Sequence, residues 1–315
     1  MSVIQALDIG LAVLVLAVAG WTITAREAFG SVVGYVAYGL LLSLVWVRLF
    51  AVDVALTEAA IGSGVTGVLL ISAVVRLRRT EAPAAADRPG IVLRLLAGAL
   101  CAVVAAALAT VVLLMPDPGA TLAPDAAKHL DELGVGNPIT AVLIAYRSFD
   151  TMLEKVVLIL AVIGVWSLAR DRTWGGAAGP RRIARPEGAL AFLAQLLPPL
   201  GIVVGIHIVW VGANEPGGAF QGGAILAAMA LIVMMARLAE APEIRARWLR
   251  LALIAGPAVF LAIGVAGFAL PGSFLAYPAG WAKPLILFIE AFMTLSIAAT
   301  LPMLVIGPPN RPPRP

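Results

Sequence analysis

The feature that most constrains this chain is the repeated occurrence of apolar segments about 20 residues long. A helix needs roughly this length to cross about 30 Å of hydrocarbon at about 1.5 Å per residue. With 61% hydrophobic and 13% charged residues, a water-exposed fold could not cover its apolar surface. We therefore predict an all-α, polytopic integral membrane protein. About nine helices are expected, at residues 3–24, 31–49, 54–75, 91–115, 149–169, 190–211, 218–238, 249–270 and 285–306.

The distribution of arginine and lysine indicates the orientation of these helices. Both residues are retained on the cytoplasmic side when they lie near helix ends. Most of them fall in segments that share one side, notably 76–94, 170–185 and 237–250. We predict an N-terminus outside, a cytoplasmic C-terminus and a multi-pass location in the cell (inner) membrane. The net charge of +4 then reflects topology, and we expect no nucleic-acid partner.

Two linkers containing Arg, Ala, Gly and Pro, at 76–89 and 170–186, separate three hydrophobic modules. No connection is long enough to form a folded catalytic domain of its own, so we expect a transport subunit and no enzyme. The expected units are a three-helix module at 1–80, a two-helix module at 90–172, a four-helix module at 188–307 and a Pro/Arg-rich cytoplasmic tail at 308–315.

Cysteine and histidine are scarce, which argues against bound metals and cofactors. The single cysteine, Cys101, allows neither an internal disulfide nor a thiolate metal site. The two histidines, His129 and His207, lie on different segments, so a bis-histidine haem is improbable. We expect no cofactor and no metal.

Ionisable residues inside the predicted spans are the candidate functional groups, because each costs a few kcal/mol in the bilayer and needs a partner, water or a role. In the third span, Asp53 is best explained as an interfacial cap. Glu58 lies deeper, and Gly62 shares its face, so a neighbouring helix can approach closely. A static interhelical hydrogen bond and a role in an ion pathway explain Glu58 equally well.

The fifth predicted helix opens with a charged cluster. Arg147, Asp150 and Glu154 share one stripe, and Lys155 lies about 100° round the helix. The cluster, which also contains Thr151, is either a buried ion-pair network that sets helix register or a hydrated proton relay. Four charges are costly for register alone.

A run rich in glycine, with one proline, forces a break between the sixth and seventh spans. A tight outer turn explains it best, and a re-entrant ion-pathway element is the alternative. His207, just before it, is either a proton carrier or a structural hydrogen-bonding residue. The residues of this helix-break motif are Gly212, Asn214, Glu215, Pro216, Gly217, Gly218, Gly222 and Gly223.

The last span contains two ionisable residues on one face, Lys283 and Glu290. Lys283 can extend its ammonium to the membrane surface, whereas Glu290 cannot easily reach it. Glu290 therefore joins Glu58 and Glu154 as a buried carboxylate that is either structural or functional.

Three motifs together resemble accessory subunits of Mrp/Mnh-type multisubunit Na⁺/H⁺ antiporters and the related membrane-bound hydrogenases. Residues 53–58 (Asp-Val-Ala-Leu-Thr-Glu), in the first module, resemble the hydrogenase protein MbhD. Asn137, the run 146–151 and Glu154, in the second module, resemble the hydrogenase protein MbhE. Residues 211–223, in the third module, are similar to the antiporter protein MnhB.

The resemblance implies a fused accessory subunit whose acids at Glu58, Asp150 and Glu154 lie near an ion pathway. Its partners would be other antiporter or hydrogenase-type membrane subunits, with H⁺ and Na⁺ as the candidate transported ions. The chain departs from the family pattern at Ala213, at Ala219 and at Lys155. The alternatives are a membrane-arm subunit of a redox-driven complex and a purely structural scaffold.

Overall fold

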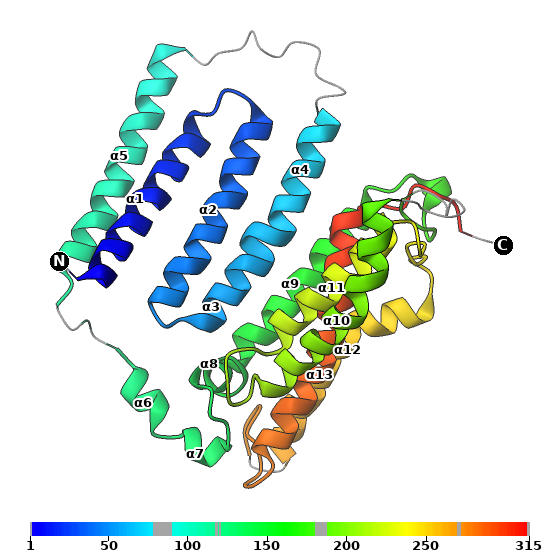
Figure 1. Ribbon diagram of the computed structural model, residues 1–315. Helices are drawn as coiled ribbons and strands as arrows, with labels where there is room; N and C mark the ends of the chain where they lie inside the picture. The colour runs from blue at the N-terminus through cyan, green and yellow to red at the C-terminus, as the bar shows by residue number, and fades with distance from the viewer. Residues whose placement is uncertain are drawn as a thin grey trace.

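The computed structural model describes residues 2–77, 90–116, 119, 121–179, 188–269 and 272–313. Within these residues the chain is helical, and its only extended pairing is an isolated bridge between Ala177 and Arg311. In the described part of the chain, seven helices are long and apolar enough to cross a membrane. Two more, α9 (Ser148–Ser167) and α11 (Ala219–Met235), complete the bundle drawn in Figure 1. The prediction of an all-α polytopic membrane protein is confirmed, and its orientation stays a prediction.

The N-terminal layer consists of α1 (Val3–Thr24), α2 (Ala28–Arg48) and a third span over Val52–Leu77. A capping box between Ser2 and Gln5 begins α1. Close packing of α1 on α2 is possible because Gly34 faces Thr22, whose Cα would lie 3.3 Å from an added Cβ. An ion pair between Asp8 and Arg48, with Nε and Oδ1 2.7 Å apart, links the same two helices.

The third span changes its helical form in the middle. It runs as α3 (Val52–Thr57), a π-helical stretch η1 (Glu58–Val65) and α4 (Thr66–Leu77). Helices of the π type are rare and often occur at functional sites. After the undescribed residues 78–89, which contain most of the first predicted linker, comes α5 (Ile91–Leu114). None of its side chains is buried against the rest of the described chain, and it lies at the edge of the N-terminal layer in Figure 1.

Short helices fill the segment between α5 and α9, where no helix was predicted. They are α6 (Ala123–Ala127), α7 (Leu130–Leu133), α8 (Pro138–Ala141) and the π-helical η3 (Val142–Tyr146). Asn137 begins α8 by accepting a hydrogen bond from the Ile139 N–H, and Pro138 occupies the first helical position. This pairing of an N-cap with proline is a standard helix start, but helices this short produce no apolar periodicity.

The C-terminal bundle packs α10 (Ala189–Val211), α11, α12 (Arg247–Ala269) and α9 around α13 (Ala282–Ile306). Helix α13 supplies much of the core, including Ile286, Ile289 and Ile297, none of which is exposed. A Cβ added at Gly223 of α11 would lie 2.7 Å from that of Ile297, so glycine allows the close contact between α11 and α13. This bundle therefore holds α13 rigidly.

At one end of the C-terminal bundle, the loops that contain Gly176, Ile244 and Arg311 pair with each other. The N–H of Ile244 donates to Gly176 at 2.9 Å, and Arg311 forms an ion pair with Glu240 at 3.1 Å. Residues 180–187, which complete the second predicted linker, and residues 314–315 of the predicted tail lie outside the described residues.

Candidate functional site

The candidate site is a cavity of about 230 Å³ at the junction of α3, α8, α9, the turn between α10 and α11, and α13. Each of the three predicted modules contributes to its wall. The lining residues are Asp53, Thr57, Ile139, Thr140, Leu143, Ile144, Thr151, Glu154, Lys155, Gly217, Gly218, Ala219, Phe220, Gln221, Glu290 and Met293.

The glycine-rich turn over residues 212–218 forms one wall of this cavity. Gly217 and Gly218 have φ angles of +152° and +127°, in a region that favours glycine. A Cβ at Gly212 would lie 2.5 Å from the Gly218 nitrogen, and one at Gly217 would lie 2.5 Å from the Ile208 carbonyl oxygen. The glycines therefore allow the chain to reverse direction within a packed interior, which explains the helix-break motif.

Helix α8 holds this turn through side-chain hydrogen bonds. Asn137 Nδ2 donates to the carbonyls of Gly212 and Glu215 at 3.2 and 3.0 Å. Thr140 Oγ1 donates to Gly212 at 2.6 Å. The backbone N–H of Asn137 also donates to Ala213, at 3.1 Å. Helix α8 thereby satisfies carbonyl groups that the interrupted helix leaves unpaired.

Asp53 connects the turn to the N-terminal layer. Its side chain is 7% exposed, and its Oδ1 accepts the Gly217 N–H at 2.8 Å. Gln221 of α11 donates to the Asp53 carbonyl at 3.3 Å and to Thr57 Oγ1 at 3.2 Å. The structure therefore places Asp53 inside a junction between modules, whereas the sequence favoured an interfacial cap.

Lys155 reaches the cavity from α9 and is only 3% exposed. Its ammonium lies 4.1 Å from the centroid of the Phe220 ring, a cation–π arrangement. Glu154 Oε1 lies 3.8 Å from the same ammonium and forms an ion pair with it. Lys155 Nζ has no hydrogen-bond partner among the described residues.

Glu290 of α13 enters the same cavity and is also 3% exposed. Its carboxyl group lies against the start of α11, where a Cβ added at Gly218 would be 3.0 Å from Glu290 Oε1. Its Oε2 atom is buried and has no hydrogen-bond partner in the described part of the chain. The cavity therefore contains one buried ammonium and one buried carboxyl oxygen that lack hydrogen-bond partners among the described residues, together with the hydrogen-bonded Asp53.

Other predicted residues lie at the margin of this cavity. Glu154 lines it but is 51% exposed. Arg147 and Asp150 form an exposed ion pair, with Nε and Oδ2 2.7 Å apart, where η3 meets α9. Thr151 points inward and donates to the Leu143 carbonyl at 2.7 Å. The predicted stripe of Arg147, Asp150 and Glu154 thus faces outward, and Lys155 occupies the inner face of α9.

Besides Arg147 and Asp150, two further candidates, His207 and Glu58, lie outside the cavity lining. His207 is exposed on α10. Glu58 starts the π-helical stretch and lies against α2, where a Cβ at Gly39 would be 3.2 Å from its Oε1. Its carboxylate also covers Gly62, so the group packed on this glycine belongs to the same span, and the approach of a neighbouring helix at Gly62 stays a prediction. The structure therefore does not bring His207 and Glu58 together with Lys155 and Glu290.

Sequence reasoning missed three contributors to the site: Thr140, Gln221 and the ring of Phe220. Each has an ordinary polar or aromatic side chain whose position follows from tertiary packing. Tyr277, between α12 and α13, supports the same wall by donating to the Ile144 carbonyl at 2.8 Å. Burial, and to a smaller extent Glu290, raises the pKa of Tyr277, so its hydroxyl stays protonated and able to donate.

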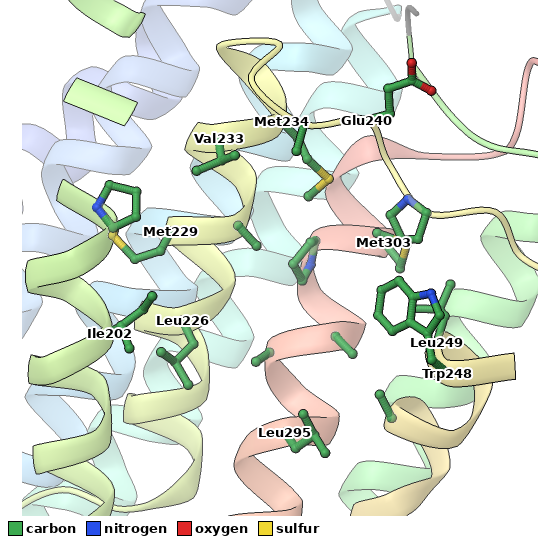
Figure 2. A pocket seen from close by; sticks show the side chains of 18 residues that line it. Ile202, Leu226, Met229, Val233, Met234, Glu240, Trp248, Leu249, Leu295 and Met303 are labelled. Atoms are coloured by element: carbon green, nitrogen blue, oxygen red, sulfur yellow. The ribbon is translucent and has the colours of Figure 1, made fainter. Parts of the chain in front are cut away.

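A second cavity, of about 490 Å³, lies among α10, α11, α12 and α13 (Figure 2). Its wall is formed mainly by apolar side chains such as Leu226, Met229 and Met303. Glu240 at its margin forms an ion pair with Arg311. Within the described residues no group of three or more His, Cys, Asp or Glu could hold a metal ion. The smaller, polar cavity is therefore the candidate site.

Comparison with known proteins matches two parts of the chain to families. Residues 13–79 match the MbhD family, the D-type subunit of MBH, and residues 189–307 match the domain related to the MnhB subunit of Na⁺/H⁺ antiporters. The chain therefore contains an MbhD-like module and an MnhB-like module. The resemblance predicted for these two modules is confirmed. The MbhE-like identity of residues 90–172 stays a prediction.

Two solved structures contain chains that resemble this protein. A chain in the Mrp complex from Dietzia sp. DQ12-45-1b shares its fold, with a TM-score of 0.75 and 24% identity over 97% of this chain and 35% of that one. A chain of the membrane-bound sulfane sulfur reductase, an archaeal respiratory membrane complex, matches with a TM-score of 0.55 and 25% identity. That match covers 68% of this chain and 97% of the reductase chain.

A curated relative also aligns with part of this chain. The uncharacterized protein MJ1307 of Methanocaldococcus jannaschii is 28% identical over an alignment of 162 residues that covers 47% of this chain. The aligned part spans 62% of that relative's length. This chain therefore spans less than two thirds of the length of MJ1307 and of the chain in the Mrp complex.

Proposed function

We propose that this chain is an accessory membrane subunit of a multisubunit cation/proton antiporter, and that the cavity at the junction of its modules belongs to the ion pathway. The MnhB-related module and the fold shared with a chain of an Mrp complex support this proposal. The partners would be other antiporter-type membrane subunits, assembled in the cell membrane with H⁺ and Na⁺ as the exchanged ions.

The observation that carries the proposal is the buried Oε2 of Glu290, which faces the cavity without a hydrogen-bond partner among the described residues. A buried carboxylate without a partner is costly, and a change of protonation state removes that cost. Ionisable residues within membrane helices commonly mark ion pathways for this reason. Glu290 can therefore alternate between a neutral, protonated form and a charged form.

Protons need a route to this buried group. Glu154 lines the cavity and is 51% exposed. It therefore connects the interior to the outer surface of α9, where a partner subunit or a water-filled path would meet the chain. Asp53 has a different role, because the backbone N–H of Gly217 already holds its carboxylate.

The test is Na⁺-driven proton movement in inverted membrane vesicles that contain the assembled complex. Glu290→Gln keeps the size of the side chain and removes its titration. We expect this variant to lose most of the exchange while assembling normally. Glu132→Gln is the matched control, since Glu132 is 74% exposed outside the cavity. Wild-type exchange by the Glu290→Gln complex would refute the proposed role of the cavity.

The likeness to a chain of the sulfane sulfur reductase complex favours a second candidate function, a membrane-arm subunit of a redox-driven pump. In that complex the chain would again transfer ions and carry no electrons. Purification through a tag on this chain, followed by mass spectrometry of every subunit, separates the two functions. Iron–sulfur subunits in the purified complex would establish the redox assembly, and large antiporter subunits without them would establish the antiporter.

A further inference from the structure

We propose that the ammonium group of Lys155 is a tethered cation that occupies the cation position of the cavity and excludes free Na⁺ from it. This inference rests on the proposed function for its biological meaning, but its physical content concerns binding alone. It assigns Lys155 the role of a residue that determines ion specificity.

The environment of Lys155 is that of a bound cation. Its ammonium lies over the face of Phe220, 4.1 Å from the ring centroid, and is almost fully buried. The negative face of an aromatic ring attracts cations of any kind. An ammonium at this position therefore uses an interaction that is equally open to a free alkali cation.

The acids around the cavity provide the balancing charge. Glu154 Oε1 lies 3.8 Å from Lys155 Nζ, while Glu290 and Asp53 face the cavity from α13 and α3. Glu290 has an unpaired buried oxygen and Asp53 has both oxygens near donors. Glu290 is therefore the acid best placed to ligate a cation within the cavity.

Oxygen atoms suitable for a hard cation are also available. The hydroxyl groups of Thr57, Thr140 and Thr151 belong to lining residues, as does the carboxyl group of Glu290. Carboxylate, hydroxyl and carbonyl oxygens are the ligands that hard cations prefer. With Lys155 in place, a second positive charge would meet strong repulsion at short range in a region of low dielectric constant. Removal of the ammonium abolishes this repulsion and leaves the oxygen ligands free to bind Na⁺.

A purely structural role is the competing explanation, in which Lys155 only anchors Phe220 and the start of α11. Such a role predicts that loss of the lysine changes stability to the same extent in every salt. A tethered cation predicts instead that its loss creates a response to Na⁺ that depends on Glu290. The dependence on Na⁺ therefore distinguishes the two explanations.

The experiment measures thermal unfolding of the complex isolated through the tagged chain, in NaCl and in choline chloride at equal ionic strength. A ligand that binds only the folded state raises the unfolding temperature. We expect the wild-type complex to unfold at the same temperature in both salts. Lys155→Met should become selectively stabilised by Na⁺, through a gain in Na⁺ affinity of at least about tenfold. The double variant Lys155→Met/Glu290→Gln should lose this stabilisation.

Lys128→Met is the matched control, because Lys128 is 66% exposed, forms an ion pair with Asp125 and does not line the cavity. It should show no selective response to Na⁺. Lys155→Gln serves as a second neutral variant if the methionine variant fails to fold. A folded, neutral variant without a Na⁺ response would overturn the proposal.

A measurement on the unaltered lysine covers the case in which neither neutral variant folds. Direct binding of ²²Na⁺ is compared between the wild-type complex and its Glu290→Gln variant. Equal, low binding supports an occupied cation position, and Na⁺ binding by the wild type that disappears in Glu290→Gln overturns it. Failure of the proposed function would appear differently, as ion exchange that is independent of Glu290.

Discussion

At the scale of single residues, the site depends on which polar groups are paired. Asp53 accepts the Gly217 N–H at 2.8 Å, whereas Glu290 Oε2 and Lys155 Nζ have no hydrogen-bond partners among the described residues. A paired carboxylate is held in one arrangement, and an unpaired one is free to exchange a proton or to ligate an ion. Asp53 is therefore expected to be mainly structural and Glu290 mainly functional.

Asp53→Ala tests the structural role. The substitution leaves the buried Gly217 N–H without its acceptor, which should destabilise the folded chain by about 1–3 kcal/mol. Asp53→Asn retains an oxygen acceptor and should cost less. Thermal unfolding of both variants measures the difference, and equal stability of Asp53→Ala and wild type would contradict the assigned hydrogen bond.

Glu154→Gln tests the route between the cavity and the outside. Because Glu154 is half exposed and lies 3.8 Å from the Lys155 ammonium, we expect its neutralisation to abolish Na⁺/H⁺ exchange in vesicles without loss of assembly. Asp131→Asn, at an exposed position of α7, is the control. Full exchange by Glu154→Gln would remove this residue from the pathway.

At the scale of elements, interruptions of regular helix structure surround the site. The turn at 212–218 separates α10 from α11, η1 interrupts the third span, and η3 precedes α9. Irregular backbone inside a membrane protein is tolerated only where protein or water satisfies its polar groups. Asn137 and Thr140 satisfy those of the turn, so the turn is stable only when α8 is docked on it.

Gly217→Ala tests the geometry of the turn. The new Cβ would lie 2.5 Å from the Ile208 carbonyl oxygen, at a φ angle of +152°, so we expect a marked loss of the folded, assembled chain. Gly98→Ala is the matched control, because a Cβ at Gly98 of α5 meets nothing within 4 Å. It should be neutral or slightly stabilising, since alanine favours helix by about 1 kcal/mol over glycine. Yield and unfolding temperature after purification report both effects, and a normal Gly217→Ala protein would contradict the described turn.

At the scale of the whole molecule, the three modules meet at one point. Asn137 contacts the Gly212 and Glu215 carbonyls and lies 3.5 Å from Asp53 Oδ2. The Asn137 side chain, from the middle module, therefore contacts both of the other modules. The MbhD-like and MnhB-like modules correspond to named subunits of other assemblies, and in this chain their junction forms the candidate ion site.

Asn137→Ala tests this junction. It removes the side-chain hydrogen bonds that join the modules, so we expect a loss of about 1–3 kcal/mol in stability together with reduced ion exchange. Asn310→Ala, at an exposed position near the C-terminus, is the control. Unfolding temperature and vesicle exchange should both fall in Asn137→Ala, and a stable variant with normal exchange would show that the junction does not depend on this residue.

Much of the architecture follows from the sequence alone, because membrane spans depend on local composition. Val3–Thr24 coincides with its predicted segment, and the other spans differ mainly at their ends. The same local reasoning predicted the helix break at Gly212–Gly218 and the common stripe of Arg147, Asp150 and Glu154. The motifs at 53–58 and 211–223 predicted the two modules that the family comparisons confirm.

The selection of the site residues required tertiary structure. Periodicity placed Lys155 off the stripe of Glu154, but it could not determine which side of α9 would face α11 and α13. The sequence favoured Asp53 as a cap at the membrane interface and offered Glu58 and His207 as ion-pathway candidates. The packing instead brings Asp53 to the cavity and leaves Glu58 and His207 outside its lining. Hydrophobic spans are encoded in contiguous residues, whereas a polar cavity forms from side chains far apart in sequence, such as Asp53, Lys155 and Glu290. Only the packing of helices determines their proximity, their burial and whether their charges are paired.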